Sequence, residues 1–314
     1  MLTTWPTSNA TLSEAVWIDL LDPTDAERAR AEQATKLRLP TKAALKEIES
    51  SSRVFIENGA FYLSTPVLES TDCMNGEVTT IGFVLSSEQL VTLRFGRVAA
   101  FDVLGASYAG VATPSARDAF LKILETIVDH TADALEHASA DLESISHDAF
   151  HANRPRRRKL AKASDELRAT LRRLGRMGDG ISHIGDTLLG LDRITAFVHE
   201  HARETHSASD ARRSNAIRGD LASLNDYQDH LSNKVQFLLD ATLGFISIDQ
   251  NDIVKTLTVV SVAGVPPVLI AGIYGMNFRN IPEFSWWLGY PYALALIAVS
   301  ALLPVAWLKW RGWM

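Results

Sequence analysis

Two long apolar stretches near the C-terminal end constrain this chain more than any other feature. Residues 284–308 contain no charged side chain, and residues 253–277 contain only Lys255. Each stretch is long enough to cross the hydrocarbon core of a bilayer, which takes about 20 mostly apolar residues in a helix. A helical hairpin buried in a soluble domain is the alternative, but such helices usually have only about 10 to 14 residues. The lengths therefore favour two membrane spans.

The composition excludes several classes of protein. The formal net charge is -6, with 31 basic and 37 acidic residues, so the dominant basic surface of a nucleic-acid-binding protein is not expected. The single cysteine, Cys73, excludes an intramolecular disulfide and a multi-cysteine metal site. Residues 1–8 lack the basic and apolar regions of a signal peptide. Because neither a Gly-rich phosphate loop nor a nucleophile elbow occurs, we do not expect an enzyme.

Residues 1–113 have the patterns of an α/β or α+β domain. Thr24 and Glu27 are spaced as a capping box, which predicts a helix over residues 25–36, and residues 43–48 predict a second, short helix. Asn58-Gly59 predicts a hairpin turn. Strands are predicted at residues 15–20, 54–56, 61–63, 79–85 and 90–93.

Residues 114–252 are predicted to form long helices. The basic run 154–159 suits a solvated helix end better than a nucleic-acid patch, and residues 204–210 predict a turn. No proline occurs between residue 209 and Pro266, so residues 209–274 could form one helix of roughly 100 Å. The Pro266-Pro267 pair offers a bend in that helix.

This long segment carries two stripes with the spacing of three and four residues that is typical of helix faces. The first stripe is apolar and predicts packing of helix on helix. It consists of Ile217, Leu221, Leu224, Leu231, Val235, Leu238 and Phe245.

The second stripe lies nearly opposite the first, because two residues along a helix rotate the face by about 200°. Small residues in a membrane helix often mark close helix packing. A pore lining is the alternative, and an acidic residue with an asparagine on the same line favours the pore. The second stripe consists of Asp240, Gly244, Ser247, Asn251, Val254, Thr258, Ser261, Val265, Val268 and Gly272.

The charges around the two spans predict their orientation. Lys255 precedes most of the first span, and Lys309 and Arg311 follow the second, whereas the connecting loop carries only Arg279 and Glu283. The excess of basic residues on the cytoplasmic side then places both termini in the cytoplasm and the loop outside. Aromatic side chains at both interfaces agree with two spans, namely Trp286, Trp287, Tyr290, Tyr292, Trp307, Trp310 and Trp313.

At the outer end of the first span stands Tyr274-Gly275-Met276-Asn277-Phe278, followed by Ile281-Pro282-Glu283-Phe284. With these motifs the chain resembles the CorA family of magnesium and divalent-cation transporters. Residues 16–20 and 244–251 are similar to the enterobacterial branch. The resemblance implies a homopentameric funnel in the plasma (inner) membrane. Its parts would be an α/β domain (1–113), cytoplasmic helices and a stalk (114–252), a pore helix (253–277), an external loop (278–285), a second span (286–308) and a basic cytoplasmic tail (309–314).

The resemblance also implies roles for the motif residues Gly275, Met276 and Asn277. Five copies of Asn277 would form a ring at the outer mouth, with the Gly275 carbonyl groups beneath it. Mg²⁺ holds its waters tightly, and an amide oxygen can accept hydrogen bonds from those waters without trapping a dication. The alternative is that Gly275 and Asn277 only end the helix in a left-handed cap.

Deeper in the pore, Asp240 and Asn251 would form polar rings toward the cytoplasm. The constriction between the rings would gate by losing its water. The family places Leu257 at this gate, while counting along a straight helix points Thr258 at the axis, so both stay candidates. Val254, Ser261, Val265, Val268 and Gly272 complete the predicted lining.

Carboxylates outside the pore have predicted roles as well. Glu283 in the loop would raise the local cation concentration. The family also senses cytoplasmic Mg²⁺, and Glu47 stands where it often has an acidic residue. The expected partner carboxylate falls near Ala216, so the sequence departs from the family there, and Asp220 is a possible substitute.

The predicted function is import of Mg²⁺, with Co²⁺ and Ni²⁺ as surrogates. A Zn²⁺ transporter of the same fold is the first alternative. None of the nine histidines lies in the spans or the loop, although a softer metal usually finds imidazole on its path. A membrane-anchored coiled-coil scaffold is the second alternative, but a scaffold does not need the polar line of the second stripe.

Overall fold

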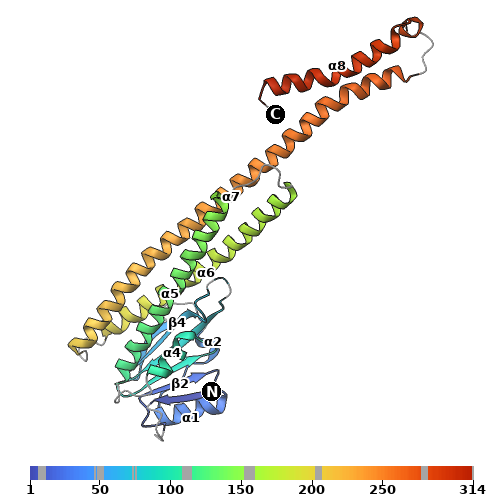
Figure 1. Cartoon of the computed structure of the whole chain (residues 1–314). Helices are drawn as coiled ribbons and strands as arrows, with labels where there is room; N and C mark the ends of the chain where they lie inside the picture. The colour runs from blue at the N-terminus through green and yellow to red at the C-terminus, as the bar shows by residue number, and fades with distance from the viewer. Residues whose placement is uncertain are drawn as a thin grey trace. The chain divides into compact units, whose positions relative to one another are not determined.

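The structure is a computed structural model of the chain (Figure 1). It describes residues 1–5, 12–45, 47, 53–72, 74, 76–107, 115–151, 160–201, 207–276 and 282–312. Asn277 and the basic run 154–159 thus lie outside the described residues. The chain divides into two compact units, the first made of Met1–Arg154 and Arg168–Asp240, and the second of Pro155–Leu167 and Ala241–Met314.

The first unit contains a six-stranded sheet with the order β1-β2-β6-β5-β4-β3. Strand β2 pairs with β6 in parallel, and the other neighbours are antiparallel. The hairpin between β3 and β4 turns at Asn58 and Gly59, whose φ angles are 50° and 79°, as a tight hairpin turn requires. The strands are β1 (Leu2–Trp5), β2 (Trp17–Leu21), β3 (Val54–Glu57), β4 (Ala60–Leu68), β5 (Val78–Leu85) and β6 (Leu90–Arg94).

Helices cover both faces of this sheet, so its central strands are apolar on both sides. On β2, Trp17 belongs to one hydrophobic core, and Ile18 and Leu20 belong to the other. Helices α1 (Asp25–Thr35) and α2 (Lys42–Leu45) lie on one side, and α4 (Ala99–Ser107) and α5 (Ala116–His151) on the other (Figure 1). The predicted capping box of α1 is confirmed, because Thr24 Oγ1 accepts from Glu27 N at 3.2 Å and the Glu27 carboxylate accepts from Thr24 N.

A buried ion pair joins β2 to β6 inside the sheet. The Asp19 carboxylate accepts hydrogen bonds from Arg94 Nη2 at 2.8 Å and from Thr92 Oγ1 at 2.7 Å. Trp17 Nε1 in turn donates to Thr92 Oγ1 at 3.0 Å. Asp19 is 2% exposed and Arg94 8% exposed, so water cannot replace a lost partner in this network.

Three long helices dominate the rest of the first unit, namely α5, α6 (Leu160–His201) and the first part of α7 (Ala208–Tyr274). Most of the first stripe of α7 is buried here as predicted, with Ile217, Leu221, Leu231, Val235 and Leu238 all in the larger core, while Leu224 is half-buried. Helix α6 approaches the sheet closely at Gly190, where an added Cβ would overlap Thr65 of β4.

Polar contacts fix the register of α7 against α5. The Arg213 guanidinium pairs with Asp118 and with Glu125, Nε to Oε1 at 2.7 Å, and the hydrogen bond to Glu125 is the main cause that raises its pKa. Further along, Lys234 Nζ pairs with Glu143 at 2.8 Å, and the rings of Phe150 and Phe237 stack at 6.0 Å.

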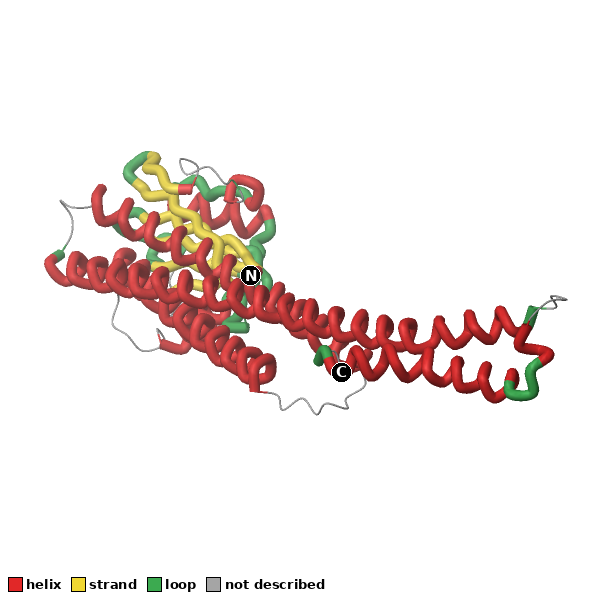
Figure 2. The backbone as a smooth tube through the Cα atoms, turned by 90° about the horizontal axis from the view of Figure 1, so that it is seen from above, coloured by secondary structure: helices red, strands yellow, loops and turns green. Residues whose placement is uncertain are grey.

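The second unit consists mainly of the end of α7, a 3₁₀ turn η2 (Pro282–Ser285) and α8 (Gly289–Trp310). Helix α8 turns back alongside the end of α7 (Figures 1 and 2). Both α7 and α8 are long and apolar enough to cross a membrane, and almost none of their most apolar windows is buried.

Some elements differ from the predicted ones. Strand β1 and helix α4 were not predicted, and α2 is only four residues long. The expected turn over residues 204–210 is wrong at its end, because α7 already begins at Ala208. Helix α8 begins at Gly289, because residues 286–288 still belong to the turn. The continuous helix predicted over residues 209–274 is confirmed, with both prolines inside it.

Candidate functional site

The second stripe of α7 is exposed along almost its whole length. Among its members only Thr258 is half-buried, and Val268 reaches 72% exposure. The half-buried positions in this part of α7 are mainly those of another face, such as Val259, Ala263 and Tyr274. The described part of this chain therefore leaves uncovered the face on which the predicted pore positions lie.

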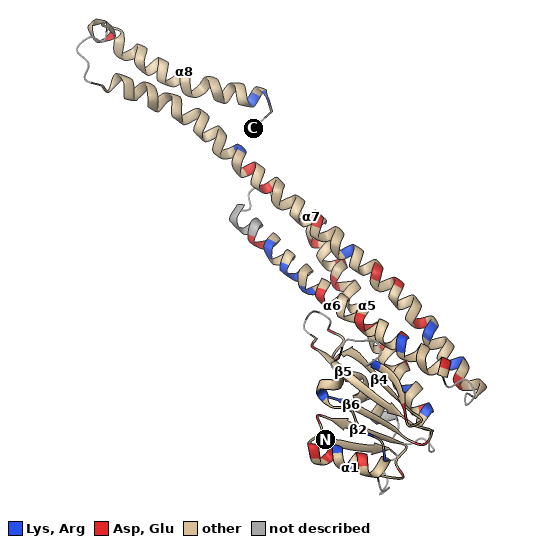
Figure 3. Cartoon of the chain, turned by 180° about the vertical axis from the view of Figure 1, so that it is seen from behind, with Lys and Arg blue, Asp and Glu red and all other residues tan. Residues whose placement is uncertain are grey.

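Charged residues occur only in the first part of α7. Acidic and basic residues alternate over its first part, and they cease beyond Asp252 and Lys255, which form an ion pair at 3.6 Å (Figure 3). From residue 256 to the end of α7 no charged residue occurs. A helix with this composition is suited to a bilayer core.

Polar groups on the exposed face bond first to their own helix. Thr258 Oγ1 donates to the Val254 carbonyl at 2.8 Å, and Ser247 Oγ donates to the Leu243 carbonyl at 3.0 Å. At the inner end, Asp240 accepts from Gln236 Nε2 at 3.2 Å. Each hydroxyl oxygen keeps lone pairs that can accept hydrogen bonds from water. The Ser247 and Thr258 hydroxyls can therefore face water without leaving their own donors unpaired.

Leu257 and Thr258, the two candidates for the gate, differ in how exposed they are. Leu257 is 65% exposed, whereas Thr258 is half-buried and its hydroxyl is bonded to its own backbone. In the single chain Leu257 is thus the more accessible of the two candidates for the gate.

A shallow groove of about 600 Å³ runs along the outer half of this face. It contains Ser261, Val265, Val268 and Gly272 from the predicted lining and Met276 from the predicted selectivity element. Sequence analysis missed its other members, because a single line along a helix names only one position per turn. Those residues flank the stripe and are Val260, Gly264, Leu269 and Ile273.

Helix α7 ends at Tyr274, the first residue of the Tyr274-Gly275-Met276-Asn277-Phe278 motif. Gly275 N donates to the Ala271 carbonyl at 2.9 Å, and Met276 N donates to the Ile273 carbonyl at 3.2 Å, so the last turn tightens. Gly275 does not adopt a left-handed conformation. A left-handed cap at this glycine is therefore wrong, and Asn277, the other candidate for a cap, lies outside the described residues.

The turn after the motif holds Glu283 in a fixed place. Its carbonyl oxygen accepts from Trp286 N at 3.2 Å. An added Cβ at Gly289 would overlap the same carbonyl, so the start of α8 can approach η2 only with a glycine. Glu283 is half-buried. Glu283 thus lies against the start of α8.

The comparisons with known proteins agree with this architecture. The sequence profile of the family described as CorA-like Mg²⁺ transporter protein matches residues 13–310. The chain belongs to the CorA family. CorA proteins are ion transporters in membranes, not enzymes.

Individual CorA proteins match nearly the whole chain. The magnesium transport protein CorA of Yersinia pseudotuberculosis serotype I (strain IP32953) is 32% identical over 306 residues, which are 96% of this chain and 93% of that protein. The magnesium transport protein CorA of Pasteurella multocida (strain Pm70) is 30% identical over 309 residues, 98% of this chain and 94% of that protein. The predicted enterobacterial-type CorA resemblance is confirmed.

The complete structure of the CorA magnesium transporter from Methanocaldococcus jannaschii superposes with a TM-score of 0.76 at 18% identity, over 100% of this chain and 98% of that one. At this identity the likeness concerns the fold. It confirms the predicted α/β domain, the long helix that continues into the first span and the second span at the C-terminal end.

The aromatic belts and the basic tail of this CorA chain are exposed. Trp287 is 87% and Trp310 85% exposed, and the Arg311 guanidinium lies 4.7 Å from the centre of the Trp307 ring. Lys309 closes α8. Trp313 lies outside the described residues.

The two predicted regulatory carboxylates lie on different elements of the first unit. Glu47 follows α2 and lines a cavity beside the sheet, and Asp220 is exposed on α7. Among the residues that the structure describes, no group of three or more His, Cys, Asp or Glu side chains is arranged to hold a metal ion.

Proposed function

We propose that this chain is one subunit of a homopentameric channel that imports Mg²⁺ through the plasma membrane, with Co²⁺ and Ni²⁺ as surrogates. The observation that carries the proposal is the exposed face of α7. Polar groups such as those of Asn251 and Ser261 are costly in hydrocarbon unless they meet water or a partner. Five copies of this face around one axis would enclose them in a wet path.

Selection would take place at the outer end of α7. A ring of Asn277 amides, with Gly275 carbonyls and Met276 beneath, would accept hydrogen bonds from the waters that Mg²⁺ retains. Keeping the hydration shell avoids the large penalty of stripping it. The nearby Glu283 would concentrate cations at the mouth.

The gate would lie between the selective ring and the inner polar rings of Asn251 and Asp240. Hydrophobic constrictions close when they lose water and open when they widen. The exposure of Leu257 favours it over Thr258 as the narrowest point. Val254, Val265, Val268 and Gly272 would line the rest of the path.

The driving force would be the membrane potential. With Lys309 and Arg311 on the cytoplasmic side, both termini are inside and the loop with Glu283 is outside. A dication then gains about 4.6 kcal/mol per 100 mV on entering, twice the value for one elementary charge.

Inside the cell, Mg²⁺ would also act as a regulatory ligand. Glu47 and Asp220 are the carboxylates that we propose for this role. Carboxylates from neighbouring copies would meet there, so that the site exists only in the assembly.

The test is ion flux in proteoliposomes. Mg²⁺ and Zn²⁺ uptake under an imposed potential is compared for the natural protein, for Asn277→Ala and for a control, Asn225→Ala, which changes an exposed asparagine on α7. We expect Mg²⁺ uptake to fall at least about tenfold in Asn277→Ala, because the ring that holds the hydrated ion is lost, and to stay unchanged in the control.

The other outcomes are distinct. Normal Mg²⁺ conduction by Asn277→Ala contradicts the selective ring. Zn²⁺ uptake without Mg²⁺ uptake supports a Zn²⁺ transporter of the same fold. Uptake of neither ion by folded protein supports the membrane-anchored scaffold.

A further inference from the structure

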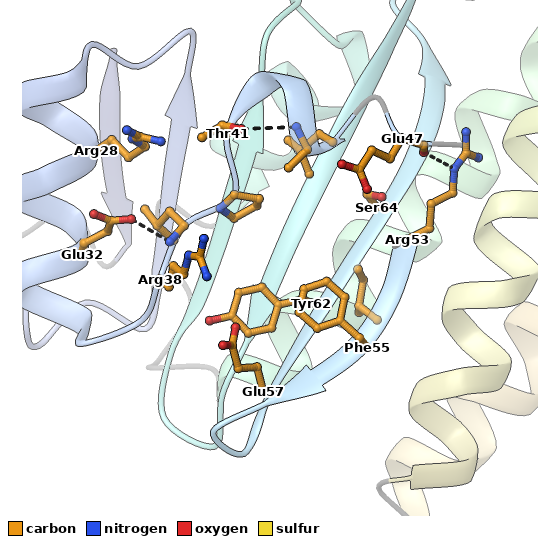
Figure 4. A pocket seen from close by; sticks show the side chains of 15 residues that line it. Arg28, Glu32, Arg38, Thr41, Glu47, Arg53, Phe55, Glu57, Tyr62 and Ser64 are labelled. Carbon is orange, nitrogen blue, oxygen red and sulfur yellow. Dashed lines mark hydrogen bonds between the residues drawn. The ribbon is translucent and has the colours of Figure 1, made fainter. Parts of the chain in front are cut away.

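A cavity of about 620 Å³ lies beside the sheet in the first unit, away from the candidate pore residues (Figure 4). Residues of α1, of the segment around Pro40, of α2 (Lys42–Leu45) and of strands β3 and β4 line it. Strand β3 is at the edge of the sheet. The volume is that of a typical small-molecule site.

An aromatic platform forms one wall of the cavity. Phe55 and Tyr62 are cross-strand partners, and their rings stack at 4.8 Å with an interplanar angle of 2°. Tyr62 is 6% exposed, whereas Phe55 on the edge strand is 38% exposed. Tyr62 therefore supports the ring of Phe55, which is left partly open to a ligand.

Arginines line two further parts of the cavity. Arg28 of α1 and Arg38 of the following segment carry their guanidinium groups toward the cavity, and Arg53 stands at its other end (Figure 4). Arg28 Nη2 lies 3.6 Å from Oδ1 of the exposed Asp25, and Arg53 Nε donates to the Glu47 carbonyl at 3.0 Å. A guanidinium has five N–H donors in a fork that matches phosphate, so each of these arginines keeps donors for a ligand.

Carboxylates complete the lining. Glu32 is bound by the Leu39 N–H at 2.8 Å and thereby fixes the segment that carries Arg38. Glu57 stands beside the Tyr62 hydroxyl, where its charge and the burial of the ring raise the pKa of that hydroxyl, burial being the larger cause. Glu47 faces the cavity from the side of α2 (Figure 4). Ionised carboxylates accept hydrogen bonds and so suit the N–H groups of a ligand.

These walls call for a ligand with an anionic end, a flat ring and N–H donors on the ring. An inorganic anion would use only the arginines, and an uncharged ring would use only the platform. We infer that the cavity binds a nucleotide, with its phosphates against Arg28 and Arg38 and its base on Phe55. Glu57 is the acceptor for the amino N–H groups of the base.

The test is equilibrium binding to the full chain in detergent, with EDTA present so that no metal bridges ligand and protein. ATP, adenosine and inorganic phosphate are the probes. The variants are Arg38→Gln and Phe55→Leu. The control is Arg97→Gln, which changes an exposed arginine of the same unit that pairs with Asp102 at 3.1 Å.

We expect ATP to bind more tightly than adenosine or phosphate. Arg38→Gln and Phe55→Leu should each weaken ATP binding by about tenfold, the usual effect of losing a charged hydrogen bond or a stacking partner. Adenosine should be sensitive to Phe55→Leu only. The control should bind as the natural protein does.

Three results would overturn the inference. If ATP does not bind at millimolar concentration, the cavity is not a nucleotide site. Equal binding of phosphate and ATP indicates a simple anion site. An equal loss in Arg38→Gln and Arg97→Gln indicates a general effect of charge. None of these results depends on ion flux, so the proposed channel function stands or fails separately.

Discussion

The two parts of α7 have the same spacing of faces but opposite surroundings. In the first unit, the face with Ile217 and Leu238 is buried against the other helices of the chain. Beyond Asp240, the face with Val265 and Val268 is covered by none of the described residues. One face is satisfied within a single chain, and the other needs a membrane, water or further copies. The following predictions test this contrast, from the largest expected effect to the smallest.

The buried part should be most sensitive at the Asp19–Arg94 pair. Asp19→Ala leaves a buried guanidinium without its partner, which costs about 3 to 5 kcal/mol in the free energy of unfolding. The control, Asp102→Ala, removes an exposed pair with Arg97 and should cost at most about 1 kcal/mol. Denaturant unfolding of the detergent-solubilised protein measures both. Equal losses would contradict a special role for the buried pair.

A substitution on the exposed face of α7 should change Mg²⁺ uptake and leave the stability of the protein unchanged. Val268→Phe adds bulk to the exposed face, so Mg²⁺ uptake should fall at least about tenfold while the midpoint of thermal unfolding stays unchanged. Val299→Phe is the matched control, since Val299 is exposed on α8, where we expect lipid. If both variants conduct alike, the exposed face of α7 does not line the path.

The contact between α5 and α7 should have an intermediate effect. Arg213→Gln loses the pairs with Asp118 and Glu125, which are only partly buried, so we expect a loss of about 1 to 2 kcal/mol that shrinks in high salt. Arg218→Gln, an exposed arginine on the same helix, should change the free energy of unfolding very little. A loss in Arg213→Gln that does not depend on salt would argue against an electrostatic contact.

The smallest effect concerns pH at the start of α1. The hydrogen bond from the Thr24 backbone lowers the pKa of Glu27 below 4.5. Its contribution is therefore fully present above the unfolded pKa and disappears as the pH falls through the lowered value. Thermal unfolding compared between about pH 6 and about pH 3 should show a smaller decline in Glu27→Gln than in the natural protein. Identical declines would mean that this capping box does not respond to pH.

Most of the fold followed from local patterns. The long helix, its buried stripe, the Asn58-Gly59 hairpin and the capping box at Thr24 each have a signal within a few residues. Strand β1 and helix α4 were missed because LTTW and AAFDVLGAS are too short to show a period. The extent of α2 depends on how the segment packs, which no local pattern records.

The candidate pore was predicted as one line of residues, and the structure widens it to a face. The cavity beside β3 and β4 was not predicted at all. Arg28, Arg38 and Phe55 belong to three different segments, and the pairing of β3 with β4 and the placement of α1 bring them to one cavity. Glu47 was singled out through the family resemblance alone, with no signal for the cavity that it lines.

The continuity of α7 couples the two parts by rotation. Each residue turns a helix by about 100°, so one residue inserted between Leu238 and Asn251 would turn the exposed face by that angle about the helix axis, relative to the buried stripe. Seven inserted residues would return the face to within about 20°. The number of residues between the two stripes therefore sets the angle between the buried face and the exposed face, independently of which residues they are.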